Sequence, residues 1–235
     1  MHTTCATAFS PTAHKKRTPV RRCAAMLVVG VLAMPLALIV DSAHAPRASA
    51  VQVTERAASW IATTSREVAL ELRAARDLPE RETAAVAGRQ INELAALVAY
   101  LLDADVDQLR SLWTSAPLQR KIAMFSALSQ IGVPYKLNAD APFIALDCSS
   151  LTKFAWAQAG LDIDRGSAQQ YARAERVDRD EVQVGDLIWY PGHIMMSLGT
   201  PELIVHARSG ERSVEVHRID PTRVKWMRYV SPLGS

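Results

Sequence analysis

The chain has 235 residues, 49% of them hydrophobic, which is enough for one ordinary domain with a sizeable core and an appended region. Its formal net charge of +3 belongs to the first fifty residues, because beyond them 21 basic side chains face 23 acidic ones. Because the remainder has a net charge near −2, its charge does not favour a nucleic-acid or anionic-membrane partner.

Residues 1–50 have the pattern of a secretory signal peptide. Five Lys or Arg side chains precede an apolar run from Ala24 to Val40, and Ala48-Ser49-Ala50 supplies small residues for cleavage before Val51. The run is short for a membrane span and Pro35 interrupts it, so cleavage is favoured over an uncleaved anchor. We expect a secreted or cell-envelope protein without a membrane segment after cleavage.

Residues 51–116 are predicted to form a helical hairpin region. Two apolar stripes at helical spacing lie on either side of Pro79, and Asp105 is expected to cap a shorter helix that follows. The stripes fit a self-contained coiled coil and packing on a neighbouring domain equally well. No motif assigns chemistry to this region, so we predict a regulatory or docking role. Its 66 residues are near the size at which a core of its own becomes marginal, so we expect it to pack against the domain that follows.

A second domain is predicted over residues 117–235. A helix from Pro117 ends at Gly132, and beyond Gly185 strand patterns are separated by turns too short for crossover helices. Such turns indicate an antiparallel sheet of about five strands, and helices followed by strands indicate the α+β class. The predicted strands are 186–190, 193–198, 202–207, 213–217 and 226–230.

Cys148 is the one cysteine that cleavage before Val51 would leave. A lone thiol in an exported protein cannot form an internal disulfide and is open to oxidation or intermolecular pairing. Small polar residues around it, Asp147, Ser149 and Ser150, are typical of a helix start, where the helix dipole favours the thiolate. The simpler interpretation is a buried core cysteine.

Two histidines lie on predicted strands downstream of the cysteine. His193 follows the turn at Pro191-Gly192, and His206 closes the next strand. If these strands are neighbours, both imidazoles lie near one sheet edge, where one of them can accept the Cys148 proton. His217 is taken as an ordinary strand residue. A zinc site is the alternative, but paired metal-ligand spacings are missing, so no metal or cofactor is expected.

Six short segments in this order resemble one known family: 127–135, 147–151, 165–171, 184–188, 193–199 and 205–207. Together they resemble the NlpC-type cell-wall cysteine peptidases, secreted bacterial peptidoglycan endopeptidases with a papain-like α+β fold. The resemblance implies that Cys148 is the nucleophile, His193 the base and His206 the polar residue that orients it. It also implies three substrate-binding residues, Tyr135, Asp147 and Ser149.

The function implied by this resemblance is hydrolysis of peptidoglycan stem peptides between D-glutamate and the diamino acid. Residues 136–140 replace the family's Trp-Gly-Gly, and Ser150 replaces a glycine, so the exact substrate stays open. Two alternatives remain: a thiol amidase or acyltransferase on the same scaffold, and a catalytically silent domain that binds or regulates another wall enzyme. The helical region lies outside the resemblance and is a candidate contact for other cell-wall enzymes.

Overall fold

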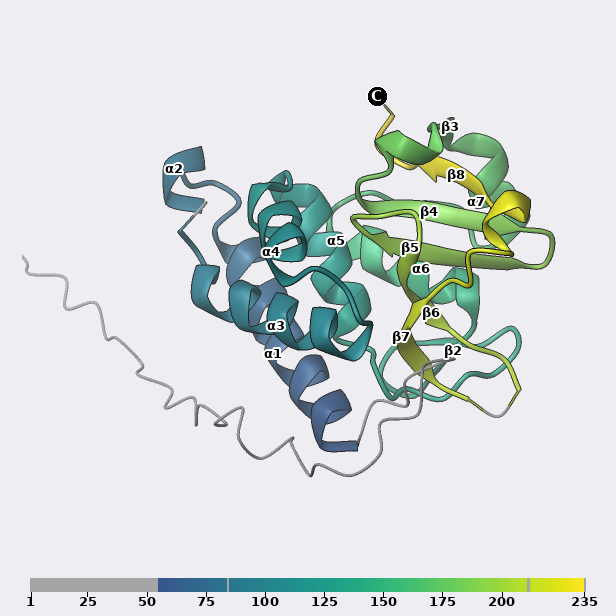
Figure 1. Cartoon of the computed structure of the whole chain (residues 1–235), viewed down its shortest axis with the longest axis horizontal. Helices are drawn as coiled ribbons and strands as arrows, with labels where there is room; N and C mark the ends of the chain where they lie inside the picture. Colours follow the sequence, from purple (N-terminus) through teal and green to yellow (C-terminus); the bar gives the residue numbers. More distant parts are fainter. Residues whose placement is uncertain (1–54, 84, 211, 235) are drawn as a thin grey trace, which may run out of the picture. The chain divides into compact units, whose positions relative to one another are not determined.

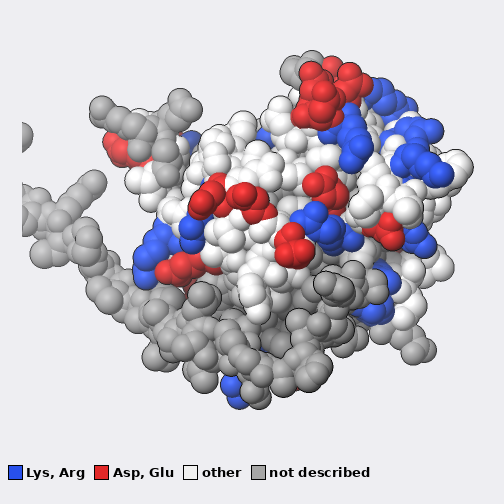
Figure 2. Space-filling view, viewed as in Figure 1, with Lys and Arg blue, Asp and Glu red and all other residues white. Residues whose placement is uncertain are grey.

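The computed structural model describes residues 55–83, 85–210 and 212–234 (Figure 1). The predicted signal peptide and its cleavage site before Val51 lie outside these residues. In the part that is described, no helix is both long and apolar enough to cross a membrane. Acidic and basic side chains are both present on the face shown in Figure 2, with uncharged surface between them.

Among its described residues, the predicted helical region contains four helices: α1 (Glu55–Ala74), α2 (Glu80–Thr83), α3 (Gly88–Leu101) and α4 (Val106–Ser115). The two apolar stripes read from the sequence are buried, as Leu72 on α1 and Leu94 on α3 show. Asp105 caps α4, because its carboxylate accepts a hydrogen bond of 2.7 Å from the amide of Gln108. The stripe and cap predictions are therefore confirmed.

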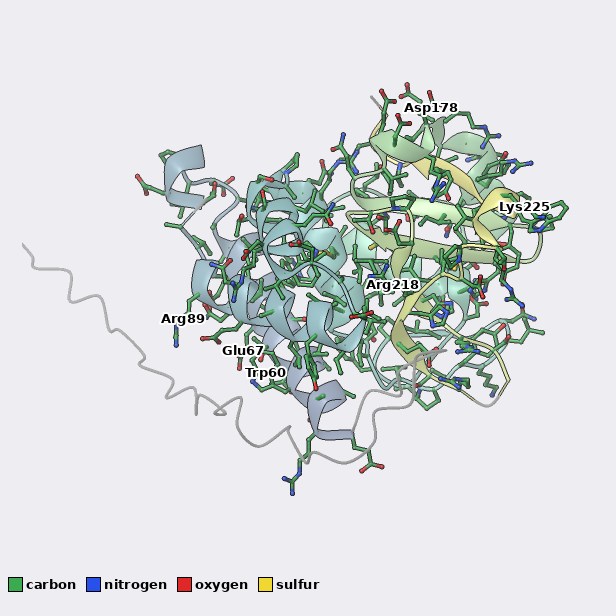
Figure 3. All side chains as sticks on the ribbon, viewed as in Figure 1. Trp60, Glu67, Arg89, Asp178, Arg218 and Lys225 are labelled. Carbon is green, nitrogen blue, oxygen red and sulfur yellow. The ribbon has the colours of Figure 1, made fainter. Side chains whose placement is uncertain are left out.

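This region shares one hydrophobic core with the sheet and does not form a separate coiled coil. Helix α1 packs along α5 (Leu118–Leu128), and the indole N–H of Trp113 donates a buried hydrogen bond of 2.8 Å to the Leu198 carbonyl. Arg218 lies between the sheet and the helices (Figure 3), where it donates to the carbonyls of Leu102 and Asp103. The boundary at residue 117 stays a prediction.

The main sheet has six antiparallel strands in the order β3-β8-β4-β5-β6-β7, which confirms the predicted α+β class. Five strands match the predicted ones, and the sixth, β3, is a two-residue strand at the edge. The strands are β3 (Glu175–Arg176), β4 (Val184–Tyr190), β5 (His193–Leu198), β6 (Leu203–Ala207), β7 (Val214–Arg218) and β8 (Arg228–Ser231).

The segment before the cysteine contains a small hairpin. Strands β1 (Asp140–Ala141) and β2 (Ala145–Leu146) pair antiparallel. Phe143, at their turn, has a φ of 65° and packs edge-on against Phe154 at 5.9 Å between ring centroids. The hairpin is thus fastened to the helix that carries the cysteine.

Helices α5 and α6 (Cys148–Gln158) pack on the sheet, α5 mainly against β4 and α6 mainly against β5 (Figure 1). A buried ion pair fixes α5, because Arg120 Nη1 lies 2.7 Å from Asp186 Oδ1 and 2.9 Å from the Val184 carbonyl oxygen. Three short helices complete the fold: α7 (Ser167–Arg173), η2 (Arg179–Glu181) and η3 (Val224–Trp226).

Candidate active site

The start of α6 is defined by a reciprocal cap. Asp147 Oδ1 accepts a hydrogen bond of 2.8 Å from the Ser150 amide, and Ser150 Oγ accepts one of 2.8 Å from the Asp147 amide. Cys148 is consequently the first residue of the helix. Ser150, one of the departures from the family pattern, supplies half of this cap.

The thiol of Cys148 is buried, with 8% of the residue exposed. Burial raises the pKa of the thiol, backbone amides led by that of Ile194 lower it, and the Asp147 charge raises it, with a net increase. This is opposite to what the helix position alone predicts, because desolvation of the thiolate outweighs the amides. The resting thiol is therefore neutral and needs a base to take its proton.

The two predicted histidines lie next to each other on adjacent strands. The Nε2 atom of His193 is 2.9 Å from Nδ1 of His206, and the two rings are nearly perpendicular, at 78°. The Ile194 amide faces the sulfur of Cys148, and His193 is the adjacent residue at this end of β5. Because His193 Nε2 contacts His206, the other ring nitrogen, Nδ1, is the one that could accept a proton from a further group.

Burial and the neighbouring His206 lower the pKa of His193, so its imidazole is neutral at pH 7 and able to accept a proton. His206 is itself buried, and burial lowers its pKa as well. His217, predicted to be an ordinary strand residue, lies with its ring centroid 5.7 Å from that of His206. Burial and then His206 lower the pKa of His217 to about 4.

Two of the predicted substrate-binding residues, Asp147 and Ser149, flank Cys148 at the start of α6. Burial and the charges of Cys148 and Asp147 raise the pKa of Tyr135, which places its hydroxyl in their vicinity. Asp147 and Ser149 are buried and bonded to Arg165, which donates to the two Asp147 oxygens at 3.0 and 2.7 Å and to Ser149 Oγ at 3.0 Å. Both carboxylate oxygens of Asp147 are therefore already engaged.

Arg165 is a site residue that sequence reasoning missed as such. Burial would raise the pKa of Asp147, but the hydrogen bonds from Arg165 and Ser150 lower it overall, so the carboxylate is charged. Arg165 belongs to a segment that resembles the family, yet its pairing with Asp147 joins residues 18 positions apart. No sequence spacing indicates such a pairing.

Gln170 is a second residue that the sequence did not single out. Its buried amide donates to the Ser149 carbonyl at 2.9 Å and accepts from the Thr152 hydroxyl at 2.7 Å, which ties α7 to the first turn of α6.

Within the described ranges, no group of three or more His, Cys, Asp or Glu side chains is placed to hold a metal ion.

An α+β domain that packs a thiol at a helix start against an antiparallel sheet with two coupled histidines has the arrangement of the papain-like class. The comparison with known families narrows this class. Residues 132–230 match the model of the NlpC/P60 family.

Curated relatives match about half of the chain. It is 30% identical over 130 residues to dipeptidyl-peptidase 6 of Lysinibacillus sphaericus, covering 51% of this chain and 47% of the relative. It is 27% identical over 123 residues to the peptidoglycan endopeptidase RipA of Mycolicibacterium smegmatis, covering 45% of this chain and 24% of the relative. The chain thus spans about half or less of the length of these relatives.

One solved structure matches a larger share of the chain. The peptidoglycan hydrolase RipB from Mycobacterium tuberculosis matches over 87% of this chain and 92% of that chain, with 20% sequence identity and a TM-score of 0.43.

Proposed function

We propose that this chain is an exported cysteine endopeptidase that hydrolyses the stem peptides of peptidoglycan. The observation that carries the proposal is the coupled pair His193–His206, held at the end of β5 where the Ile194 amide meets the sulfur of Cys148. The match of residues 132–230 to the NlpC/P60 family and the similarity to the peptidoglycan endopeptidase RipA support the substrate class.

The proposed reaction begins with transfer of the Cys148 Sγ proton to Nδ1 of His193. The sulfur then attacks the peptide carbonyl carbon, and amides at the start of α6, which have no acceptor within the helix, stabilise the oxyanion. The carbon–nitrogen bond breaks as His193 returns the proton to the leaving amine. Water, deprotonated by the same imidazole, hydrolyses the thioester and restores the thiol.

The bond between D-glutamate and the diamino acid is the proposed cleavage site. The charged cluster beside the thiol supports a substrate with a free amino end, since the Asp147 carboxylate is ionised and Tyr135 lies near it. Because Arg165 already binds both Asp147 oxygens, an incoming ammonium group would share this carboxylate with the arginine. We propose Tyr135, Asp147 and Ser149 as the residues that bind this end.

The test is incubation of the full chain with purified muropeptides in water labelled with heavy oxygen, followed by mass spectrometry. We expect fragments with a new amino terminus on the diamino acid and one heavy oxygen in the new D-glutamyl carboxylate. Muropeptides incubated without protein provide the control. Cleavage at another bond would change the proposed specificity.

The same experiment separates the two alternatives. An acyl group passed to an added amine without heavy oxygen would indicate a thiol acyltransferase. Muropeptides that are retained by the protein and recovered intact would indicate a silent binding domain. Either result would overturn the hydrolase proposal.

A further inference from the structure

Glu215 lies directly opposite His206 in the ladder between β6 and β7. Its Oε1 atom is 3.8 Å from Nε2 of His206, and both side chains are largely buried, at 15% and 8% exposure. This separation is longer than a hydrogen bond, and the buried Nε2 atom makes none within the described residues. A movement of about 1 Å would join the two groups.

Two arginines fix the Glu215 carboxylate in place. Arg208 Nη1 donates to Oε1 at 2.9 Å, while Arg212 donates to Oε2 from Nη2 at 2.6 Å and from Nε at 3.1 Å. Burial would raise the pKa of Glu215, but His206, Arg212 and Arg208 outweigh burial and lower it to about 2. The carboxylate is ionised at neutral pH and can only accept hydrogen bonds.

We propose that Glu215 is a positioning residue that sets the tautomers of His206 and His193, a role that rests on the proposed thiol chemistry. A carboxylate in front of His206 Nε2 requires that nitrogen to carry the proton. A neutral imidazole has one N–H, so His206 Nδ1 becomes an acceptor. His193 Nε2 must then donate across the 2.9 Å contact, which leaves Nδ1 unprotonated and able to accept the Cys148 proton.

Of the side chains around the two histidines, Glu215 is the one that sets the tautomer of His206. The imidazole ring of His217 lies near His206 from β7, and Tyr190 lies 5.4 Å from His193 between ring centroids. Arg208 and Arg212 only donate, and they lower rather than raise the pKa of His206. Glu215 is therefore the acceptor that faces His206 Nε2, and its two arginines offset much of its charge without removing its lone pairs.

The proposal is tested without substrate, by the rate at which iodoacetamide alkylates Cys148. The full chain, Glu215→Gln, Glu215→Asp and a matched control, Glu202→Gln, are compared by mass spectrometry of the Cys148 peptide between about pH 6 and about pH 10. Glu202 precedes β6 at the end away from His206, so its variant makes the same charge change in the same sheet. Circular dichroism checks that each variant is folded.

We expect Glu215→Gln to react about tenfold more slowly than the parent at about pH 6 to 7, because an amide can donate as well as accept and leaves the tautomers mixed. The rates should converge near pH 10, where the thiol ionises without a base. Glu215→Asp should fall between the two, and Glu202→Gln should match the parent.

Two results would overturn the proposal. An unchanged pH profile in Glu215→Gln would show that the carboxylate does not act on the histidines. Faster alkylation at every pH, with a weakened circular dichroism signal, would show that Glu215 only holds strands β6 and β7 together. Failure of the muropeptide reaction would leave this readout intact, because alkylation reports the thiol itself.

Discussion

The helical region from α1 to α4 buries mainly apolar side chains, whereas the site at the start of α6 buries polar and ionisable ones. Leu72, Leu94 and Trp113 lose their exposure to a common core, and that burial stabilises the fold. Asp147 and His206 are also buried, at a cost in desolvation that only specific partners reduce. Buried polar groups at the start of α6 therefore belong to the candidate site, whereas the buried Arg120–Asp186 pair and the apolar stripes hold the fold together.

The largest expected effect separates the two kinds of burial. Cys148→Ala should lower stem-peptide hydrolysis by at least about a thousandfold, because it removes the nucleophile. Its melting temperature should change little, since alanine keeps the helix start and fills most of the space. Muropeptide mass spectrometry and thermal unfolding measure the two quantities. A large loss of stability with hydrolysis retained would show that Cys148 serves the fold and not the reaction.

His206 should sharpen the distinction within the site. Replacement by alanine should lower kcat by about a hundredfold, whereas His206→Asn should lower it by less than about tenfold, because an amide still bonds His193 Nε2. Steady-state kinetics on a purified muropeptide give both values. If His206→Asn is as inactive as His193→Ala, His206 must itself carry protons, contrary to an orienting role.

Trp113 tests whether the apolar side chains buried in the helical region mainly stabilise the fold. Trp113→Ala should lower the free energy of unfolding by about 3–5 kcal/mol, because it leaves a cavity between α4 and the sheet. Trp113→Phe should cost less, about 1–3 kcal/mol, mainly from the Leu198 carbonyl that loses its 2.8 Å hydrogen bond. Urea denaturation measures the stability. A folded variant with a lower kcat at saturating substrate would show that the helices also shape the site.

The smallest effect is a pH dependence of stability that comes from the site region. Burial lowers the pKa of His193, His206 and His217, so below about pH 6.5 the unfolded chain binds protons that the folded chain does not. Their contribution to stability is present above about pH 6.5 and is lost as the pH falls. Glu215, with a pKa of about 2 against 4.5, adds a further loss below about pH 4.5.

The melting temperature should accordingly fall between about pH 7 and about pH 5, and His217→Asn should make the fall shallower. A variant outside the site, Trp113→Phe, should keep the slope of the parent while its curve lies lower. Equal slopes in His217→Asn and the parent would contradict the assignment of acid sensitivity to the histidines.

The fold was largely predictable because local patterns specify it. The strands alternate or run apolar between short turns, and Asp105 occupies a capping position that needs only three residues to recognise. The small size of the helical region favoured packing on the following domain, but the stripes alone did not identify α5 as the helix that α1 contacts. Because other elements of the same chain bury these stripes, the stripes no longer support docking of other cell-wall enzymes in this region.

The site was predictable in its residue types and not in its electrostatics. A cysteine at a helix start and two strand histidines follow from short segments. The raised pKa of the Cys148 thiol depends on how deeply the sheet covers it, which no local pattern reports. Arg165 and Glu215 meet their partners through tertiary contacts and strand register, so single-sequence spacing cannot reveal them.

The central claim is that Cys148, with His193 as its base, forms a covalent bond to the substrate. The most direct measurement is acid quenching of the full chain during muropeptide turnover, followed by mass spectrometry of the Cys148 peptide. The account predicts a thioester that carries the amino-terminal part of the stem peptide, absent in His193→Ala, which removes the base needed for acylation. Product formation that persists in Cys148→Ala, with no adduct on the parent thiol, would contradict it.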